Sequence, residues 1–217
     1  MTTFPNSPRL VKGGIVLLDP RSAEIRRIIV LQYNPDSLSR TLQSQAVELG
    51  GQNRSEAMRL KGPPVETIKL EAELDATDQL EVSSAAAGQV GVLPQLAALE
   101  SLVYPSSQQL LANDALARQG RLEITPMEAP LSLFIWSRSR IVPVRVTDFS
   151  VTEEAFDPAL NPIRAKVSLG LRVLSVDDLG FQHRGGSLYM AYQQQKEQLA
   201  ARSAAGALST LGIERIP

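Results

Sequence analysis

The chain contains no cysteine and a single histidine among its 217 residues. Without cysteine, disulfides, thiolate metal sites and thiol nucleophiles are all excluded. The histidine, His183, lies in the glycine-rich segment Phe181–Gly186, where no second ligand or catalytic partner stands at a workable spacing. The sequence therefore predicts a protein that is not an enzyme, with no catalytic residue, no cofactor and no metal site.

Net charge and long apolar runs are also lacking. The 22 basic and 23 acidic residues leave a net charge of −1, so no whole-molecule field favours nucleic acid. In Val82–Asn113 the only charged residue is Glu100, yet glycines and a proline interrupt the run before it reaches the roughly 20 apolar residues that span a bilayer. The first residues lack the apolar centre of a secretory signal. We expect no nucleic-acid partner, no direct membrane insertion, and synthesis and assembly in the cytoplasm.

Strand signals are strongest in the second half of the chain. From Ile163 to Val173, apolar residues alternate with polar ones, which is the period of a half-buried strand. The preceding segment Asp157–Pro162 combines two prolines with Asp and Asn and predicts a chain reversal, so Thr147–Phe156 should pair antiparallel with that strand. Glu66–Leu74 shows the same alternation and predicts another strand.

Weaker signals complete a mainly β pattern. Further strands are predicted at Gly14–Leu18, Ile25–Tyr33, Ser37–Glu48, Leu122–Ile124, Leu131–Trp136 and Ile141–Val146. Helices are predicted from Asp75 to about Gly88, and at Gly91–Val103, Ser106–Arg118 and Ser187–Leu208. The fold class that follows is α+β, mainly β.

Two segments are candidates for contacts with other subunits. Gly50–Pro64 has no apolar periodicity and is predicted to be a long exposed loop, either disordered or functional. It carries the basic residues Arg54, Arg59 and Lys61. In the last predicted helix, Tyr189 and Tyr192 share one face and Leu199 follows two turns later, which favours packing against the sheet or against a neighbouring subunit.

Three stretches together resemble the tube-protein family of bacterial contractile injection systems, which are phage-tail-like particles. They are Ile29–Arg40, Phe134–Trp136 with Val142–Val146, and Ala155–Ala165, and the likeness covers approximately Gly13–Gln198. The resemblance implies a tail-tube-like fold, in which a strongly bent antiparallel sheet forms a split β-barrel with a flanking helix. On this basis residues 1–180 would form the barrel domain, with a helical insertion at about 76–120, and residues 181–217 a C-terminal helical tail.

The resemblance also implies partners. Six copies would join sheet edges into a homohexameric ring whose inner strands line a channel, and the loop at about residues 50–64 would reach into the adjacent ring. Arg54, Arg59 and Lys61 would then contact acidic or polar groups there, while Tyr189, Tyr192 and Leu199 are further interface candidates. The insertion and the tail exceed what a minimal tube unit needs, which favours a baseplate subunit that contacts the spike hub, the inner tube protein and other baseplate subunits, and that initiates the tube.

Two alternatives stay open at this stage. The chain could be the repeating inner-tube subunit, which would polymerise indefinitely. More remotely, it could be a hydrolase or cargo effector that uses serine, aspartate and His183, although the partners that a catalytic base requires are missing from the sequence.

Overall fold

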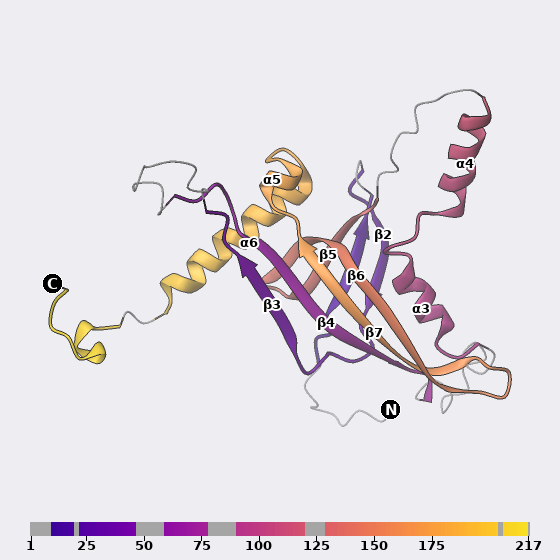
Figure 1. Ribbon diagram of the computed structural model, residues 1–217, viewed down its shortest axis with the longest axis horizontal. Helices are drawn as coiled ribbons and strands as arrows, with labels where there is room; N and C mark the ends of the chain where they lie inside the picture. The colour runs from indigo at the N-terminus through magenta and orange to yellow at the C-terminus, as the bar shows by residue number, and fades with distance from the viewer. Residues whose placement is uncertain are drawn as a thin grey trace.

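The computed structural model describes residues 10–19, 22–46, 59–77, 90–119, 129–203 and 206–216. Within them a single antiparallel sheet has the strand order β2-β1-β5-β6-β7-β4-β3 (Figure 1). The sheet is not closed, because β2 and β3 are its two outer strands. The strands are β1 (Gly14–Leu18), β2 (Ile25–Val30), β3 (Leu38–Gln43), β4 (Val65–Asp75), β5 (Leu131–Ser137), β6 (Arg140–Phe156) and β7 (Pro162–Val173).

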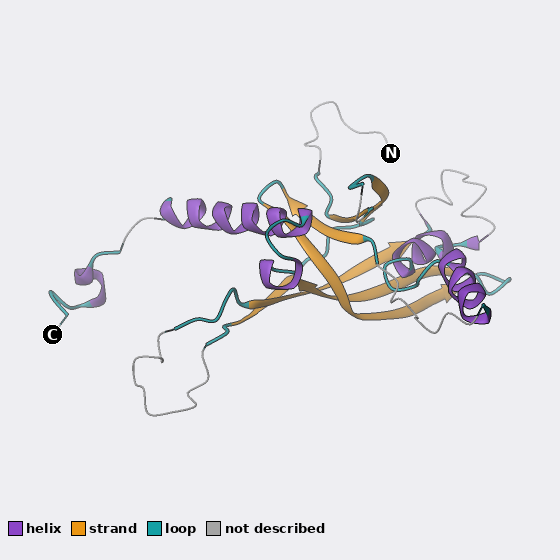
Figure 2. Cartoon of the chain, turned by 90° about the horizontal axis from the view of Figure 1, so that it is seen from above, coloured by secondary structure: helices purple, strands orange, loops and turns teal. Residues whose placement is uncertain are grey.

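The helices lie toward the two ends of the sheet. Figure 1 shows α5 and α6 at one end and α3 and α4 at the other. Viewed from above, α6 runs outward past the strands (Figure 2). The bounds are α3 (Leu93–Glu100), α4 (Ser107–Arg118), α5 (Val176–Leu179), α6 (Arg184–Ala201) and a 3-10 turn, η2 (Leu208–Leu211).

The main core shows that the sheet curls on itself. Ile15 of β1 and Ile29 of β2 belong to the same buried cluster as Ile68 of β4 and Leu169 of β7, although β5 and β6 separate these strands in the sheet. Leu96 and Leu99 of α3 also belong to that cluster. The result is a split barrel with α3 packed into its interior.

A smaller core lies on the opposite face of β1 and β5. It contains Val16, Leu18, Leu131 and Leu133, and Leu179 of α5 and Leu188 of α6 pack against it. Both faces of this end of the sheet are therefore covered. The start of β6 shares this double cover, since Val142, Pro143 and Val144 are all buried. Beyond it, the strands β6, β7, β4 and β3 have no second apolar cluster among the described residues, and α5 contacts them at Arg172.

The structure confirms the predicted fold class, α+β and mainly β, as an open antiparallel barrel with a flanking helix, inserted helices and a C-terminal helix. The predicted hairpin is confirmed, since β6 and β7 pair antiparallel from Val144 opposite Val173 to Phe156 opposite Pro162. Its turn is held by Asp157, whose carboxylate accepts hydrogen bonds from the backbone N–H groups of Ala159 and Asn161, both at 2.8 Å. The Asn161 side chain also donates to this carboxylate, at 2.8 Å. This bond and the two backbone hydrogen bonds lower the pKa of Asp157, and they outweigh the opposing effect of burial.

Several predicted boundaries were wrong. The separate strands Ile141–Val146 and Thr147–Phe156 are one strand, because a bulge between Val146 and Asp148 restores pairing with β7 instead of ending it. The strand at Ser37–Glu48 ends at Gln43. The helix predicted at Gly91–Val103 is shorter than expected. It spans Leu93–Glu100 as α3, and residues 101–103 form a non-helical turn before Pro105.

The terminal helix also differs from its prediction at Ser187–Leu208. It begins at Arg184, because the His183 side chain accepts the Gly185 N–H and caps it, and it ends at Ala201. Residues 206 and 207 are not helical, in keeping with the low helix propensity of glycine at Gly206. The strand predicted at Leu122–Ile124 and most of the helix predicted from Asp75 to Gly88 lie outside the described residues.

Candidate functional site

A continuous polar face covers one side of β3, β4, β7 and β6. Strand register places its residues in rows, for example Ser39, Lys69 and Gly170 beside Asp148. The reverse side of the same strands is apolar, as the alternating burial of β4 shows. The polar face carries Ser39, Thr41, Thr67, Lys69, Glu71, Glu73, Asp148, Ser150, Thr152, Glu154, Arg164, Lys166, Ser168 and Arg172.

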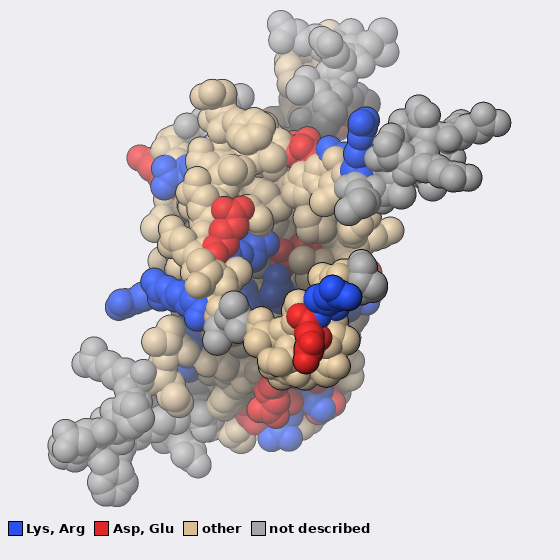
Figure 3. Space-filling model, turned by 90° about the vertical axis from the view of Figure 1, so that its left-hand side faces the viewer, with Lys and Arg blue, Asp and Glu red and all other residues tan. Residues whose placement is uncertain are grey.

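Charges of both signs are mixed on this face. Arg164 pairs with Asp75 at 2.8 Å, and the exposed Lys166 lies 3.6 Å from Glu154. Figure 3, which views the side toward the C-terminal arm, likewise shows acidic and basic side chains interspersed without a large area of one sign. Such a surface is well hydrated and offers no strong field to an anionic polymer.

The sheet has three open edges among the described residues. Strand β3 pairs only with β4, and β2 pairs only with β1. Strand β6 pairs with β5 from Arg140 to Val144, so residues 145–156 have a strand neighbour, β7, on one side alone. Unpaired edges present free N–H and C=O groups to which another strand can add.

A buried carboxylate ties the edge strand β3 to helix α6. Glu66 of β4, whose side chain is 3% exposed, accepts a hydrogen bond from Arg40 Nε at 2.8 Å. The Tyr192 hydroxyl accepts from Arg40 Nη2 at 3.0 Å and donates to Glu66 Oε1 at 3.2 Å. We call these three residues the Glu66 cluster. A single acid thus joins two strands and a helix.

The surroundings of the Glu66 cluster shift the pKa values of Tyr192 and of the neighbouring Lys196. Burial raises the pKa of Tyr192, and the negative charge of Glu66 raises it further. Lys196 lies with its Nζ 4.0 Å from Glu66 Oε2 and 4.3 Å from the centre of the Tyr192 ring. Burial lowers the pKa of Lys196, although Glu66 opposes the shift. The phenol therefore stays protonated and able to donate at neutral pH.

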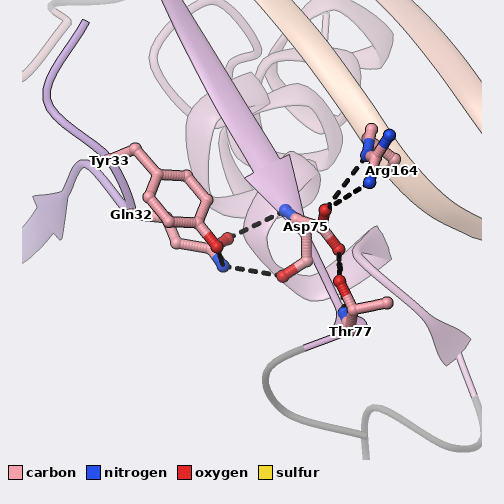
Figure 4. Close-up of polar contacts among 5 residues, drawn as sticks. All are labelled: Gln32, Tyr33, Asp75, Thr77 and Arg164. Atoms are coloured by element: carbon pink, nitrogen blue, oxygen red, sulfur yellow. Dashed lines mark hydrogen bonds and ion pairs between the residues drawn. The ribbon is translucent and has the colours of Figure 1, made fainter.

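The split of the barrel is bridged by a side-chain amide (Figure 4). Gln32, just after β2, donates from Nε2 to the backbone oxygen of Asp75 at 2.6 Å and accepts the Asp75 N–H at 3.0 Å. Paired residues of antiparallel strands also donate one backbone hydrogen bond to each other and accept one. The Gln32 side-chain amide therefore takes the place of a backbone partner for Asp75. The end of β4 is thereby fixed to the chain that follows β2.

The Asp75 carboxylate holds the same corner from the other side. Arg164 of β7 donates to it from Nε at 3.0 Å and from Nη2 at 2.8 Å, and the Thr77 N–H donates at 2.9 Å (Figure 4). The Thr77 hydroxyl donates to it as well. Burial alone would raise the pKa of Asp75, but the hydrogen bonds from Thr77 and the pairing with Arg164 together lower it.

The structure separates the interface candidates predicted from sequence. Tyr189 and Tyr192 are each 4% exposed, so their rings pack within the chain's own core. Leu199 is 48% exposed on the outer half of α6. Arg59 and Lys61 are exposed beside the short bridge between Ala46 and Leu60, and Arg54 lies outside the described residues. Contacts of Leu199, Arg59 and Lys61 with a partner stay a prediction.

Sequence reasoning missed Glu66 and Gln32. A signal for Glu66 was present, because it falls in phase with Ile68, Leu70 and Leu74, the buried side of β4. Arg40 is likewise in phase with Leu38 on β3. Charged residues in phase with an apolar face indicate a buried ion pair. No comparable signal marks Gln32.

The described residues contain no group of three or more His, Cys, Asp or Glu side chains placed to hold a metal ion. None of the helices that the structure describes is long and apolar enough to cross a membrane.

No protein-family model matches the chain, and no curated protein matches it. Among solved structures, it is similar to a chain from the tail of an empty GTA particle computed with helical refinement in C6 symmetry, with a TM-score of 0.28 and 12% identity over 75% of this chain and 90% of that one. It is also similar to a chain from the virion of a native gene transfer agent (GTA) particle, with a TM-score of 0.26 and 11% identity over 74% of this chain and 95% of that one. TM-scores this low do not establish a common fold.

Proposed function

We propose that this chain is a structural subunit of a bacterial contractile injection system. It forms a homohexameric ring that joins the spike hub to the inner tube and initiates tube assembly. The observation that carries the proposal is that one four-stranded unit, β3-β4-β7-β6, has one open edge along β3 and another along residues 145–156 of β6, and a largely exposed polar face that α5 contacts at Arg172. Such a unit satisfies its edge groups when copies join, and its polar face then lines a hydrated channel.

The preference for the initiator over the repeating tube subunit rests on the helices. Helix α4 has no buried residue, and it exposes Leu110, Leu111 and Leu116. Helix α6 buries residues only in its first half, up to Tyr192. Elements that project in this way suit contacts with unlike partners, such as the hub or other baseplate subunits, better than the uniform stacking of identical rings.

His183, the histidine that the enzymatic alternative would use, has a structural role. The His183 imidazole accepts the Gly185 N–H at 3.1 Å and so serves as the cap of α6. We expect His183→Ala to lower stability by about 1 kcal/mol through loss of the cap, while assembly persists. His183→Asn, which keeps a capping acceptor, should restore the stability.

Seeding experiments test the initiator role. The purified chain is mixed in trace amounts with the inner tube protein of the same particle, and tube number and length are counted by electron microscopy. An initiator increases the number of tubes in proportion to added rings and shortens them, while it forms no tubes alone. Long tubes of this chain alone would make it the repeating subunit. Rings that leave tube number unchanged would refute initiation.

A further inference from the structure

We infer that residues 153–161, the turn that joins β6 to β7, form a docking surface for an unlike protein subunit. We call these residues the hairpin tip. Its apolar side chains, Phe156 and Leu160, would enter an apolar pocket of the partner, and lysine or arginine side chains would border that pocket. The inference rests on the proposed function, because it names the surface that meets the spike hub or the inner tube.

The hairpin tip exposes two large apolar side chains. Phe156 is 51% exposed and Leu160 is 78% exposed. The loop between β6 and β7 projects past the end of β4 (Figure 1), so the tip is free to reach a neighbouring protein. Aromatic and large aliphatic side chains contribute strongly to an interface once a partner removes them from water. These two residues are therefore the anchors of the contact.

The backbone of the tip also points to a contact outside the chain. Leu160 has a φ of 65° and Ala155 a φ of 53°, both in the left-handed region. Glycine and asparagine adopt this region more readily than leucine does. Leu160 thus has an unfavourable backbone conformation, and its exposed side chain gains little burial within its own fold. A local cost of this kind is typical of a residue that is kept for binding.

The tip is held firmly at its base. The Pro162 oxygen accepts the Val92 N–H at 2.9 Å, and the Ile163 oxygen accepts the Ala76 N–H at 2.9 Å. Gly91 lies so close to the Pro162 oxygen that a side chain at this position has no room. The start of α3 and the end of β4 therefore brace the hairpin. A fixed tip loses little conformational entropy when it binds.

The charge of the tip specifies the kind of partner. It contains Glu153, Glu154 and Asp157 and no lysine or arginine. Lys166 lies 3.6 Å from Glu154, whereas neither Glu153 nor Asp157 forms an ion pair with any of the described residues. The remaining negative charge repels anionic lipid, nucleic acid and the same tip of another copy. It attracts a protein surface whose apolar pocket has a basic rim.

Titrations with the inner tube protein and with the spike hub protein of the same particle test the docking. Phe156→Ala removes the aromatic anchor and should weaken binding to one of these two proteins at least about tenfold. Phe181→Ala is the matched control, because Phe181 is 67% exposed at the turn before α6. The control should bind like the wild type. Isothermal titration calorimetry measures the dissociation constants.

Leu160→Asn separates binding from folding. Asparagine adopts the left-handed conformation more readily than leucine, so the urea midpoint of unfolding should stay the same or rise. Loss of the apolar side chain should nevertheless weaken binding about fivefold or more. A lower midpoint would show that Leu160 stabilises its own chain, and unchanged binding would show that it is no anchor. Either result would overturn the inference.

A charge reversal tests the basic rim. Glu153→Lys should slow association with the partner at low salt, and the difference from the wild type should shrink as salt is added. Glu71→Lys makes the same charge change on β4, away from the tip, and should leave the association rate unchanged. Equal effects of the two variants would contradict a basic rim around the pocket.

The outcomes distinguish this inference from the proposed function. A wild-type chain that binds neither the hub nor the tube protein would overturn the proposed function. Wild-type binding that Phe156→Ala leaves unchanged would overturn the docking surface alone. If Phe156→Ala instead abolished self-association of the chain and spared binding to both proteins, the occupant would be a second copy, and the inference of an unlike partner would be wrong.

Discussion

The two ends of the sheet are built on different plans. In β1 and β5 successive residues are buried, because one cluster lies inside the barrel and another lies beneath α5 and α6. In β4 and β7 burial mostly alternates, and one face is polar. The first end is therefore packed on both faces by other parts of the same chain. The second end keeps open edges and a polar face, which the proposed ring would use to join copies.

The largest effect should come from placing a charge on the doubly covered end. Leu133→Lys puts an ammonium where the side chain is 7% exposed beneath α5 and α6, and should lower the free energy of unfolding by at least about 4 kcal/mol. Ser150→Lys on the polar face should change it by less than about 0.5 kcal/mol. Urea denaturation followed by circular dichroism measures both. Equal losses would show that the two faces do not differ as described.

The second largest loss of stability should come from helix α3, because α3 lies outside the sheet and packs two leucines into the barrel core. Leu96 is 2% exposed, and Leu96→Ala should cost about 2 to 5 kcal/mol through lost burial and the cavity that remains. Leu93, on the same helix but 40% exposed, provides the control, and Leu93→Ala should cost below about 1 kcal/mol. A small loss at Leu96 would mean that α3 is a mobile appendage.

The Glu66 cluster allows a test at the end of the sheet that has the open edges. Arg40→Met leaves a buried carboxylate short of its closest partner and should cost about 3 kcal/mol, while Tyr192→Phe removes one hydroxyl and should cost about 1 kcal/mol. Pairing Arg40→Met with Glu66→Met removes both charges and should recover most of the loss. Chemical denaturation of the wild type, Arg40→Met, Glu66→Met and the double variant gives the coupling energy, and strict additivity would refute the cluster.

The smallest expected effect is the loss of stability at low pH that Asp75 causes. The native pKa of Asp75 is lowered, so its stabilisation is complete above the unfolded value and is lost as pH falls through the native one. As the pH falls from about 6 to about 3, the wild type should lose more stability than Asp75→Asn. Thermal unfolding across this range provides the measurement. Identical pH profiles would show that the Asp75 carboxylate does not stabilise the corner between β4 and β7.

Sequence reasoning recovered the elements whose pattern is local. The alternation in β4 and β7 and the turn at Asp157–Pro162 identify those strands directly. It predicted two strands in place of β6, because a bulge interrupts the two-residue period without ending the strand. It missed α5, whose four residues are defined by a capping box at Ser175 and not by apolar periodicity.

The candidate site was harder to predict because its contacts are distant in sequence. Glu66 and Tyr192 are separated by 126 positions, and Gln32 and Asp75 by 43. The tyrosine pair on α6 was recognised, but whether it faced the sheet or a neighbour could not be decided from spacing alone. Which strands form edges depends on strand order, and no local pattern encodes that order.

Native mass spectrometry of the purified chain, alone and mixed with its tube partner, tests the central claim most directly. The account predicts closed rings of six copies, visible as rings by negative-stain microscopy, either alone or when the tube partner is added. A chain that stays monomeric under both conditions, at concentrations where the tube partner assembles, would contradict it.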